Sequence, residues 1–306
     1  MEYLKSKGIV GGYPDGTFKP KQQVNRAEAL KLILSPVLPE DRLSIYAHSL
    51  FTDVPDGSWF LPYTEAARST LGVISGPPEK TKFLPGDPIK MSEFLKMFLL
   101  TQHVDPQGSY KELTEPLSSD VSSDMWFFPF IRYALSSSMI MIHDDGTLRP
   151  QETLTREDVA QLMYRYFMYK AGRRSQALLS VTEAEISNLM AMIDANDPDQ
   201  AAFAAARSLV TSRGALTSDP KADVVRGAVK TAEGFHFILQ AYLAEKAGNL
   251  EDAIAKAGAA WNTASKAREL SPSLVDMANQ MQDLAKKLAD SARQMKAGSE
   301  TSRKAN

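Results

Sequence analysis

A sequence repeat constrains this chain more than any other feature. Its clearest copy, at residues 11–20, reads Gly-Gly-Tyr-Pro-Asp-Gly-Thr-Phe-Lys-Pro, and a weaker copy at residues 144–150 reads Asp-Asp-Gly-Thr-Leu-Arg-Pro. The closing prolines Pro20, Pro85 and Pro150 recur every 65 residues. Because one repeat of this kind is a supersecondary unit that cannot bury its apolar face alone, the copies are expected to pack against one another.

A second block lies upstream of the glycine turn in two of the copies. Asp53 stands six residues before Trp59, and Asp120 stands six residues before Trp126. The two aspartates are expected to cap the helices that carry the tryptophans. A tryptophan offers a large apolar surface and one N–H group, so both indoles are predicted to belong to the core, with contact to a ligand as the alternative.

Each copy is expected to end in a helix whose start is visible in the sequence. Asn25 followed by Glu28 has the form of a capping box, and Thr155 with Asp158 repeats the pattern. In the middle copy Ser92 is the predicted cap. The repeat thus reads as Asp-Val, Trp, a helix, a glycine turn, Arg-Glu and a second helix.

The order and combination of these motifs resemble the S-layer homology repeat, a module that usually occurs in threes. The resemblance covers roughly residues 1–169. It implies a mainly all-α fold, a pseudo-threefold spindle of helix–loop–helix repeats. The copies are expected at residues 1–35, truncated at the N-terminus, at residues 51–103, degenerate, and at residues 118–172.

The resemblance also implies a ligand, an anionic cell-wall polysaccharide that often carries pyruvate ketals. The positions that match the binding residues of the family are Arg26, Arg156, Gly12, Tyr13, Asp15, Gly16, Asp145, Gly146, Trp59 and Trp126. The chemistry is coherent, because a guanidinium pairs with a carboxylate through two parallel hydrogen bonds and glycine lets backbone N–H groups approach a ligand closely. The alternative for each arginine is a solvated surface residue.

The middle copy departs from the family pattern. Met91 stands where the arginine is expected, and Lys80-Thr81-Lys82 replaces Asp-Gly-Thr. Lys80 or Lys82 could supply a cation, but an ammonium is a point charge without the planar fork of arginine. The groove of this copy is therefore predicted to be degenerate.

The sequence from residue 175 onward is alanine-rich and predicts a separate α-helical bundle over residues 180–297. The expected helices are Thr182–Ala195, Pro198–Ser212, Ala222–Ala247, Leu250–Leu270 and Ser273–Lys296. Apolar residues recur at steps of three and four, which is typical of seams that pack helix against helix. The turn at residues 247–249 is faintly similar to that of a tetratricopeptide helix pair. A closed bundle is favoured over a coiled-coil oligomer or a peptide-binding groove.

Composition and motifs exclude several classes of protein. The net charge of −2 argues against nucleic-acid binding, and the absence of cysteine excludes disulfides and thiolate metal sites. No apolar run reaches the roughly 18 residues of a membrane-spanning helix. The histidines His48, His103, His143 and His236 show no metal-ligand spacing, and no catalytic motif is found, so no enzyme, metal or cofactor is expected.

These observations predict a non-catalytic protein of the cell envelope, outside the cell and bound to a cell-wall polymer. The alternative is a protein-interaction scaffold that works through its helical region and a protein partner. A third reading is a wall-bound hydrolase whose catalytic part lies upstream of this chain. The first residues contain no signal sequence and lie inside the first repeat, so a fragment of a longer protein or a misplaced start is expected.

Overall fold

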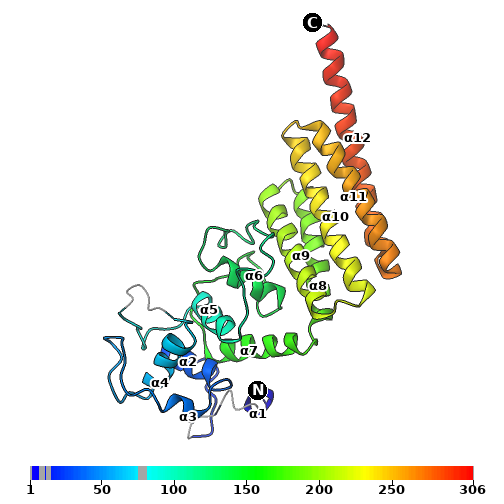
Figure 1. Ribbon diagram of the computed structural model, residues 1–306. Helices are drawn as coiled ribbons and strands as arrows, with labels where there is room; N and C mark the ends of the chain where they lie inside the picture. The colour runs from blue at the N-terminus through cyan, green and yellow to red at the C-terminus, as the bar shows by residue number, and fades with distance from the viewer. Residues whose placement is uncertain (1, 7–10, 12–14, 75–80, 306) are drawn as a thin grey trace. The chain divides into compact units, whose positions relative to one another are not determined.

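The computed structural model describes residues 2–6, 11, 15–74 and 81–305, and these residues form helices with isolated β-bridges between loops (Figure 1). This confirms the predicted, mainly α fold class. The chain forms two compact units. The repeat unit comprises Met1–Ser109, Asp124–Ala134 and Leu148–Phe167, and the helical unit comprises Tyr110–Ser123, Leu135–Thr147 and Met168–Asn306.

The helices of the repeat unit are short. They are α1 (Glu2–Ser6), α2 (Arg26–Leu34), α3 (Glu40–Leu43), α4 (Leu61–Glu65) with the π-helical turn η1 (Ala66–Thr70), α5 (Met91–Thr101), and the portions of α6 (Phe128–Ser136) and α7 (Arg156–Lys170) that fall in this unit. Helices α2, α5 and α7 are equivalent, because each begins six residues after the closing proline of its copy. The sequence repeat is therefore also a repeat of helices.

Backbone hydrogen bonds join the three copies into a closed ring. The N–H of Val24 donates to the carbonyl of Leu154 at 2.9 Å, the N–H of Leu154 donates to Ile89 at 3.0 Å, and the N–H of Ile89 donates back to Val24 at 2.9 Å. All three side chains are buried. Since each copy gives one bond and receives one, the ring has the cyclic order expected of a pseudo-threefold arrangement.

The first turn of each equivalent helix docks on the turn of another copy. The N–H groups of Arg26 and Ala27 donate to the carbonyls of Asp87 and Pro85. The same two bonds join Met91 and Ser92 to Glu152 and Pro150, and Arg156 and Glu157 to Gln22 and Pro20. The first N–H groups of a helix have no partner inside the helix, so these contacts satisfy donors that would otherwise be unpaired.

The residue before each closing proline has a positive φ. The values are 53° at Lys19, 59° at Leu84 and 50° at Arg149. Side chains other than glycine rarely adopt this left-handed conformation, which costs free energy. Its recurrence at all three equivalent positions shows that the turn geometry belongs to the repeat and outweighs the local preference of each residue.

The predicted caps are confirmed in two copies and wrong in one. Asn25 and Glu28 form a complete capping box, and the Asp158 carboxylate accepts bonds from the N–H and hydroxyl of Thr155. Ser92 is not a cap, because α5 begins at Met91, with Lys90 at the N-cap position, so Ser92 lies inside the helix. Ser92 is buried and its N–H bonds to another copy, so contact between copies fixes the helix start.

The predicted capping role of Asp53 is also wrong. Its carboxylate accepts hydrogen bonds from the N–H groups of Phe83 at 2.8 Å and Leu84 at 2.7 Å. It therefore supports the strained turn before Pro85 rather than the helix of the tryptophan block, α4. Asp120 accepts a bond from the Ser118 hydroxyl, and its capping role stays a prediction.

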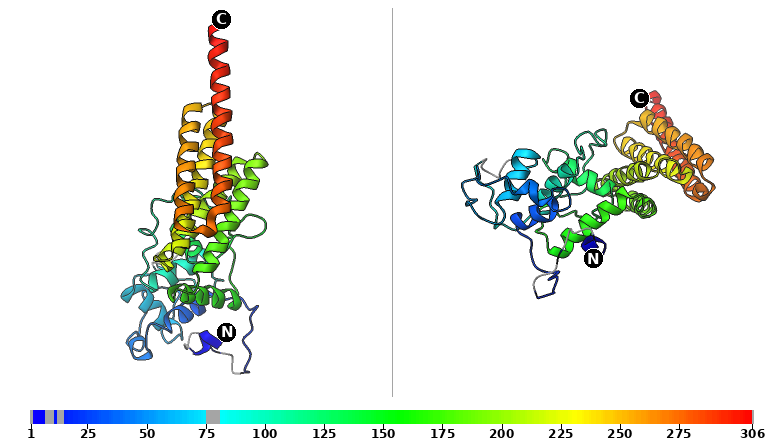
Figure 2. Two further views of the ribbon diagram at one scale, coloured as in Figure 1. Left: turned by 90° about the vertical axis from the view of Figure 1, so that its right-hand side faces the viewer. Right: turned by 60° about the horizontal axis from the view of Figure 1, so that its bottom comes forward.

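The helical unit contains five long helices. They are α8 (Ser175–Asp194), α9 (Pro198–Ser218), α10 (Asp223–Lys246), α11 (Leu250–Leu270) and α12 (Val275–Ala305), with the 3-10 turn η2 (Pro272–Leu274) before the last. Each packs against the next in sequence, and α10 also packs against α8 and α12 (Figure 2). Asp197 caps α9, since its carboxylate accepts the N–H of Gln200.

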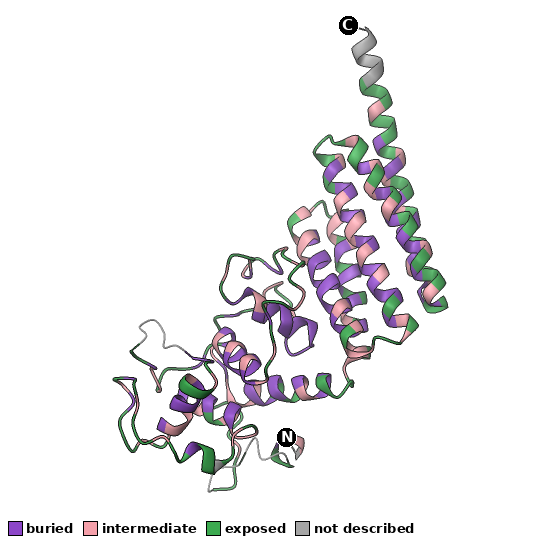
Figure 3. Ribbon diagram, in the orientation of Figure 1, coloured by how far each residue is buried: buried purple, intermediate pink, exposed green. Residues whose placement is uncertain are grey.

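Small residues let these helices approach closely. A Cβ added at Gly234 of α10 would lie 2.1 Å from the sulfur of Met281 on α12, and a Cβ at Gly214 would lie 1.7 Å from the carbonyl oxygen of Ser136. Figure 3 shows buried positions along the facing sides of the helices. The core also holds an ion pair, with Glu185 and Arg207 joined by two hydrogen bonds of 2.8 Å.

None of the helices among the described residues is both long and apolar enough to cross a membrane.

Candidate functional site

Arg26, the first residue of α2, is buried and fully engaged with another copy. The residue is only 4% exposed. Nε donates to the carbonyl of Phe83 at 2.9 Å, one terminal nitrogen pairs with the Glu93 carboxylate at 3.1 Å, and the guanidinium lies 5.0 Å from the centre of the Phe83 ring. Burial lowers the pKa of Arg26, and the negative charge of Glu93 opposes that shift. Arg26 thus holds two copies together in this structure.

Arg156 has the equivalent geometry but is more accessible. Its Nε donates to the carbonyl of Phe18 at 2.9 Å, a terminal nitrogen donates to the carbonyl of Gly11 at 3.2 Å, and the guanidinium lies 4.9 Å from the Phe18 ring centre. The side chain is half-buried. Of the two predicted arginines, Arg156 is the one that presents a cationic group at the surface.

The third equivalent position carries no cation. Met91 is buried at the start of α5, where α2 and α7 have arginine. Lys82 is exposed, and Lys80 lies outside the described residues. The middle position therefore differs from the other two in charge, as its sequence predicts.

The glycine turns of the first and third copies are alike, although they belong to different units. In each, an aspartate Oδ1 accepts the backbone N–H and the hydroxyl of the threonine two residues on: Asp15 with Thr17, and Asp145 with Thr147. These bonds lower the pKa of Asp15. Gly16 and Gly146 both have φ of 77°, which explains why each turn needs glycine. Gly12 and Tyr13 lie outside the described residues.

The two tryptophans of the repeat unit are surface residues, so their predicted place in the core is wrong. Trp59 and Trp126 are each 52% exposed. Trp59 makes edge contacts with Phe60 and Tyr63, at 5.4 and 6.4 Å between ring centres. Trp126 makes the same contacts with Phe127 and Phe130, at 5.4 and 6.3 Å. The flanking rings cover part of each indole and leave the rest open to solvent.

A lysine completes each of these aromatic clusters, and sequence reasoning missed both lysines. The Nζ of Lys31 lies 5.5 Å from the ring centre of Trp59, and the Nζ of Lys96 lies 5.5 Å from that of Trp126. The signal was available, because both lysines are the sixth residue of an equivalent helix and stand 65 residues apart. We call Trp59 with Lys31, and Trp126 with Lys96, the tryptophan–lysine platforms.

The three equivalent helices carry different sets of candidate residues. Helix α2 has Arg26, which is buried, and Lys31, which is exposed. Helix α5 has Met91 and Lys96, and α7 has the accessible Arg156. The position in α7 that matches the two lysines is Gln161, which bonds to Glu157. The threefold frame is thus regular in its backbone and irregular in its surface chemistry.

Within the described part of the chain, no cluster of three or more acidic or histidine side chains could hold a metal ion. Such an arrangement of exposed indoles, ammonium groups and one guanidinium can bind an anion next to a flat apolar ring face. A sugar that carries a carboxylate has both features.

The comparison with protein families supports the resemblance. The S-layer homology domain matches residues 1–30 and 119–160. The chain is 29% identical over 164 residues to cell surface glycoprotein 1 of Acetivibrio thermocellus, across 52% of this chain and 7% of that protein. It is 26% identical over 180 residues to the cellulosome-anchoring protein of the same organism, across 58% of this chain and 38% of that protein.

Further relatives differ in what their names say they do. The S-layer protein EA1 of Bacillus anthracis is 25% identical over 188 residues, which cover 61% of this chain and 20% of that protein. An amylopullulanase of Thermoanaerobacterium thermosulfurigenes is 27% identical over 167 residues, which cover 54% of this chain and only 8% of the enzyme. In all four relatives named here, the region matched is less than two fifths of the protein.

Proposed function

This chain contains S-layer homology domains, and we propose that its repeat unit attaches it, without catalysis, to an anionic polysaccharide of the cell wall. The relatives with names of surface-layer or anchoring proteins support attachment to the cell envelope. The enzyme among the relatives shares too small a part of its length to carry its activity over to this chain. The proposed place of action is the outer side of the cell envelope.

The observation that carries this proposal is the pair of tryptophan–lysine platforms. Two exposed indoles, each with an ammonium 5.5 Å from its ring centre, lie at equivalent places in two copies. Each lysine Nζ lies over its indole ring, so a sugar ring is proposed to pack on the exposed part of the indole that the lysine leaves open, while a carboxylate on the same sugar pairs with the lysine. A pyruvate ketal is one substituent that supplies such a carboxylate.

Arg156 is proposed as a third contact, and Arg26 is assigned a smaller part in binding. The guanidinium of Arg156 is half-exposed, so a carboxylate can reach it. Arg26 already pairs with Glu93 and is buried, and a ligand would have to displace that carboxylate. The glycine turn at Asp15 and Gly16 is proposed to contact the polysaccharide in the repeat unit, and the matching turn at Asp145 and Gly146 is proposed to contact it separately, in the helical unit.

Co-sedimentation with purified cell-wall sacculi tests the proposal. The double variant Trp59→Ala, Trp126→Ala and the double variant Lys31→Gln, Lys96→Gln are expected to weaken binding about tenfold or more each. Trp261→Ala is the matched control, because Trp261 is also exposed, at 44%, but lies in the helical unit. Circular dichroism checks that each variant is folded.

The outcomes separate the candidate functions. Binding that both double variants lose and the control retains supports attachment through the platforms. Binding that survives in all variants refutes the platforms as the site. No binding of the unchanged chain to sacculi refutes the proposal and favours the scaffold function of the helical unit.

A further inference from the structure

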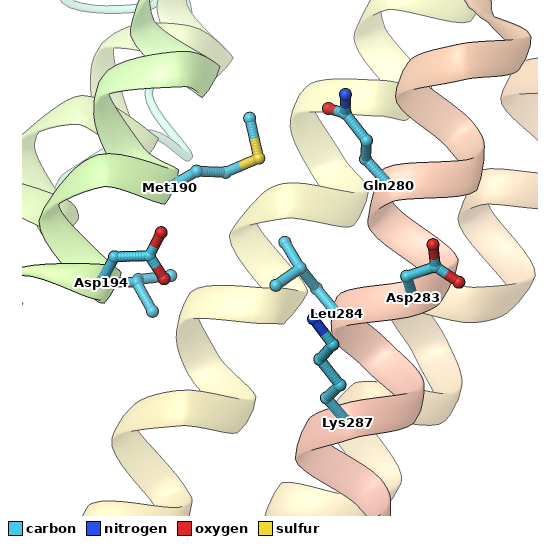
Figure 4. Close-up of a pocket in the computed structure, with 7 residues that line it drawn as sticks. Met190, Asp194, Gln280, Asp283, Leu284 and Lys287 are labelled. Carbon is cyan, nitrogen blue, oxygen red and sulfur yellow. The ribbon is translucent and has the colours of Figure 1, made fainter.

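Helices α8 and α12 both pack against α10, and a groove of about 250 Å³ lies between them (Figure 4). It is lined by Met190, Ile193 and Asp194 from α8 and by Gln280, Asp283, Leu284 and Lys287 from α12. The two walls of the groove are therefore α8 and α12, and α10 contacts both of these helices. We call this groove the trough.

The inner surface of the trough is apolar and adaptable. Met190, Ile193 and Leu284 are half-buried and pack against the main core of the helical unit. Met277 and Leu288 extend the stripe along α12, at seven residues before and four residues after Leu284. Methionine is flexible and polarisable, so a trough wall with Met190 and Met277 can adjust to side chains of different shape.

The charged side chains at the rim are unpaired and mainly acidic. Within the described residues, Asp194, Asp283 and Lys287 make no hydrogen bond or ion pair. Helix α8 contains no lysine or arginine, so it supplies no cation near Asp194. The one cation in the lining, Lys287, comes from α12. The lining as a whole carries two negative charges and one positive charge.

We propose that this trough binds a basic amphipathic helix of a partner protein. A helix packs against neighbouring helices at about 8–10 Å, so a guest helix that lies along α8 and α12 would place the side chains of one face in the trough. Apolar residues of the guest at steps of three and four would meet Met190, Ile193 and Leu284. Lysine or arginine beside them would pair with Asp194 and Asp283.

The end of this chain does not supply the guest. Residues 297–305 read Ala-Gly-Ser-Glu-Thr-Ser-Arg-Lys-Ala and contain no apolar side chain larger than alanine. A segment of this kind has charge but no anchors for the apolar part of the trough. Residues 297–305 are therefore not the proposed occupant, the acidic side chains at the rim favour a basic partner, and the proposal stands independently of attachment to the cell wall.

Fluorescence anisotropy with a labelled synthetic peptide tests the proposal on the full chain. The probe is a helix of about 16 residues with leucines at steps of three and four, flanked by lysines. Its matched control has glutamates in place of the lysines. The basic peptide is expected to bind with a Kd of about 1–100 μM, and the acidic peptide about tenfold more weakly or worse.

Charge reversal in the trough gives the second arm of the test. The double variant Asp194→Lys, Asp283→Lys is expected to weaken binding of the basic peptide about tenfold or more. The double variant Asp252→Lys, Glu269→Lys makes the same change of net charge at exposed positions of α11 and is expected to bind like the unchanged chain. All four substituted residues are exposed, so folding should be retained.

Three results would overturn the proposal. The first is no binding of the basic peptide up to about 1 mM, and the second is equal loss in the trough and control variants, which would mean general attraction between charges. The third is self-association of the chain, seen by light scattering, that the trough variant abolishes. That result would make a second copy the occupant.

Discussion

The two units differ in how their parts pack against one another. In the repeat unit every copy exchanges backbone hydrogen bonds with both other copies, giving to and receiving from each, so the arrangement closes on itself. In the helical unit each helix packs mainly on the next, and the first and last helices, α8 and α12, each follow or precede only one other long helix in the row and also contact α10. A closed ring leaves no copy at an end, whereas a row of helices leaves its end helices with open sides.

The two units also differ in what carries their contacts. The ring of Val24, Ile89 and Leu154 and the docking of helix starts depend on backbone groups. Every residue type supplies the carbonyl, and every type except proline supplies the N–H. The helical unit depends on side-chain size, as the close approach of Met281 to Gly234 shows. Substitutions at the surface should therefore be tolerated in the first unit more readily than changes of size in the core of the second.

The largest effect is expected at the buried ion pair of the helical unit. Glu185→Gln leaves Arg207 charged without its partner, and breaking such a pair costs about 3–5 kcal/mol of unfolding free energy. Urea unfolding followed by Trp261 fluorescence, with Trp59 and Trp126 changed to phenylalanine, measures this unit. Asp290→Asn, which breaks an exposed pair, is the control. Unchanged stability of Glu185→Gln would contradict the predicted role of the pair.

A slightly smaller effect is expected at the ring. Ile89→Ala keeps the backbone bond but leaves a cavity, at a cost of about 2–5 kcal/mol. Because the ring is closed, the second and third copies should unfold together. Two single-tryptophan variants, retaining Trp59 or Trp126, should give one common midpoint. Two separate unfolding midpoints would contradict the prediction, since the second and third copies would then unfold independently of one another.

A helix cap should matter less. Asn25→Ala removes the acceptor for the N–H of Glu28 and is expected to cost about 1 kcal/mol. Chemical unfolding followed by Trp59 measures it. Lys31→Ala on the exposed side of the same helix is the comparison, and an equal loss in both variants would show that the cap has no special part.

The helical unit is expected to lose stability as the pH falls, because burial lowers the pKa of His236 from its usual 6.5. Glu115 opposes that shift, and Lys256 adds to it. Above pH 6.5 the histidine is neutral in both states, and below it the unfolded chain takes up the proton first, so the free energy of unfolding decreases. The Trp261 midpoint, compared at about pH 7.5 and pH 5.5, should move less in His236→Gln. An equal movement in both proteins would exclude this cause.

The smallest effect is expected at the far end of α12. Lys296 pairs with Glu251 at the start of α11, and α12 continues past that point (Figure 2). Deletion of residues 297–306 should leave the unfolding midpoint of the helical unit unchanged within error. A clear loss of stability would show that the last residues of α12 do contribute to the stability of the helical unit.

Sequence reasoning recovered the periodic parts of the fold and missed what depends on distant contacts. The repeat, the capping boxes and the five long helices follow from local patterns. Helix α8 was expected to begin at Thr182 and α9 to end at Ser212, yet α8 begins at Ser175 and α9 continues to Ser218. Gly214 is required there because the Ser136 carbonyl comes too close for any Cβ, and no local pattern reveals that contact.

The candidate site shows the same division. The matched positions of the arginines and tryptophans were visible, but the burial of Arg26 follows from Glu93 and Phe83, which come from another copy. Exposure of the tryptophans could not be read from composition, because a large apolar residue is normally an argument for burial. Lys31 and Lys96 could have been found by extending the repeat through the helices.

The backbone ring has a consequence for how strongly the chain could hold a polymer. The two platforms and Arg156, the contacts proposed above, lie in one unit and would engage one long chain of sugars at once, and linked weak contacts give an avidity far above that of any single contact. Met91 in place of an arginine leaves the spacing of these contacts intact, since the ring is made by the main chain. A site of this kind can lose one contact and still bind the polymer, and the residence time of the complex decreases with each contact that is lost.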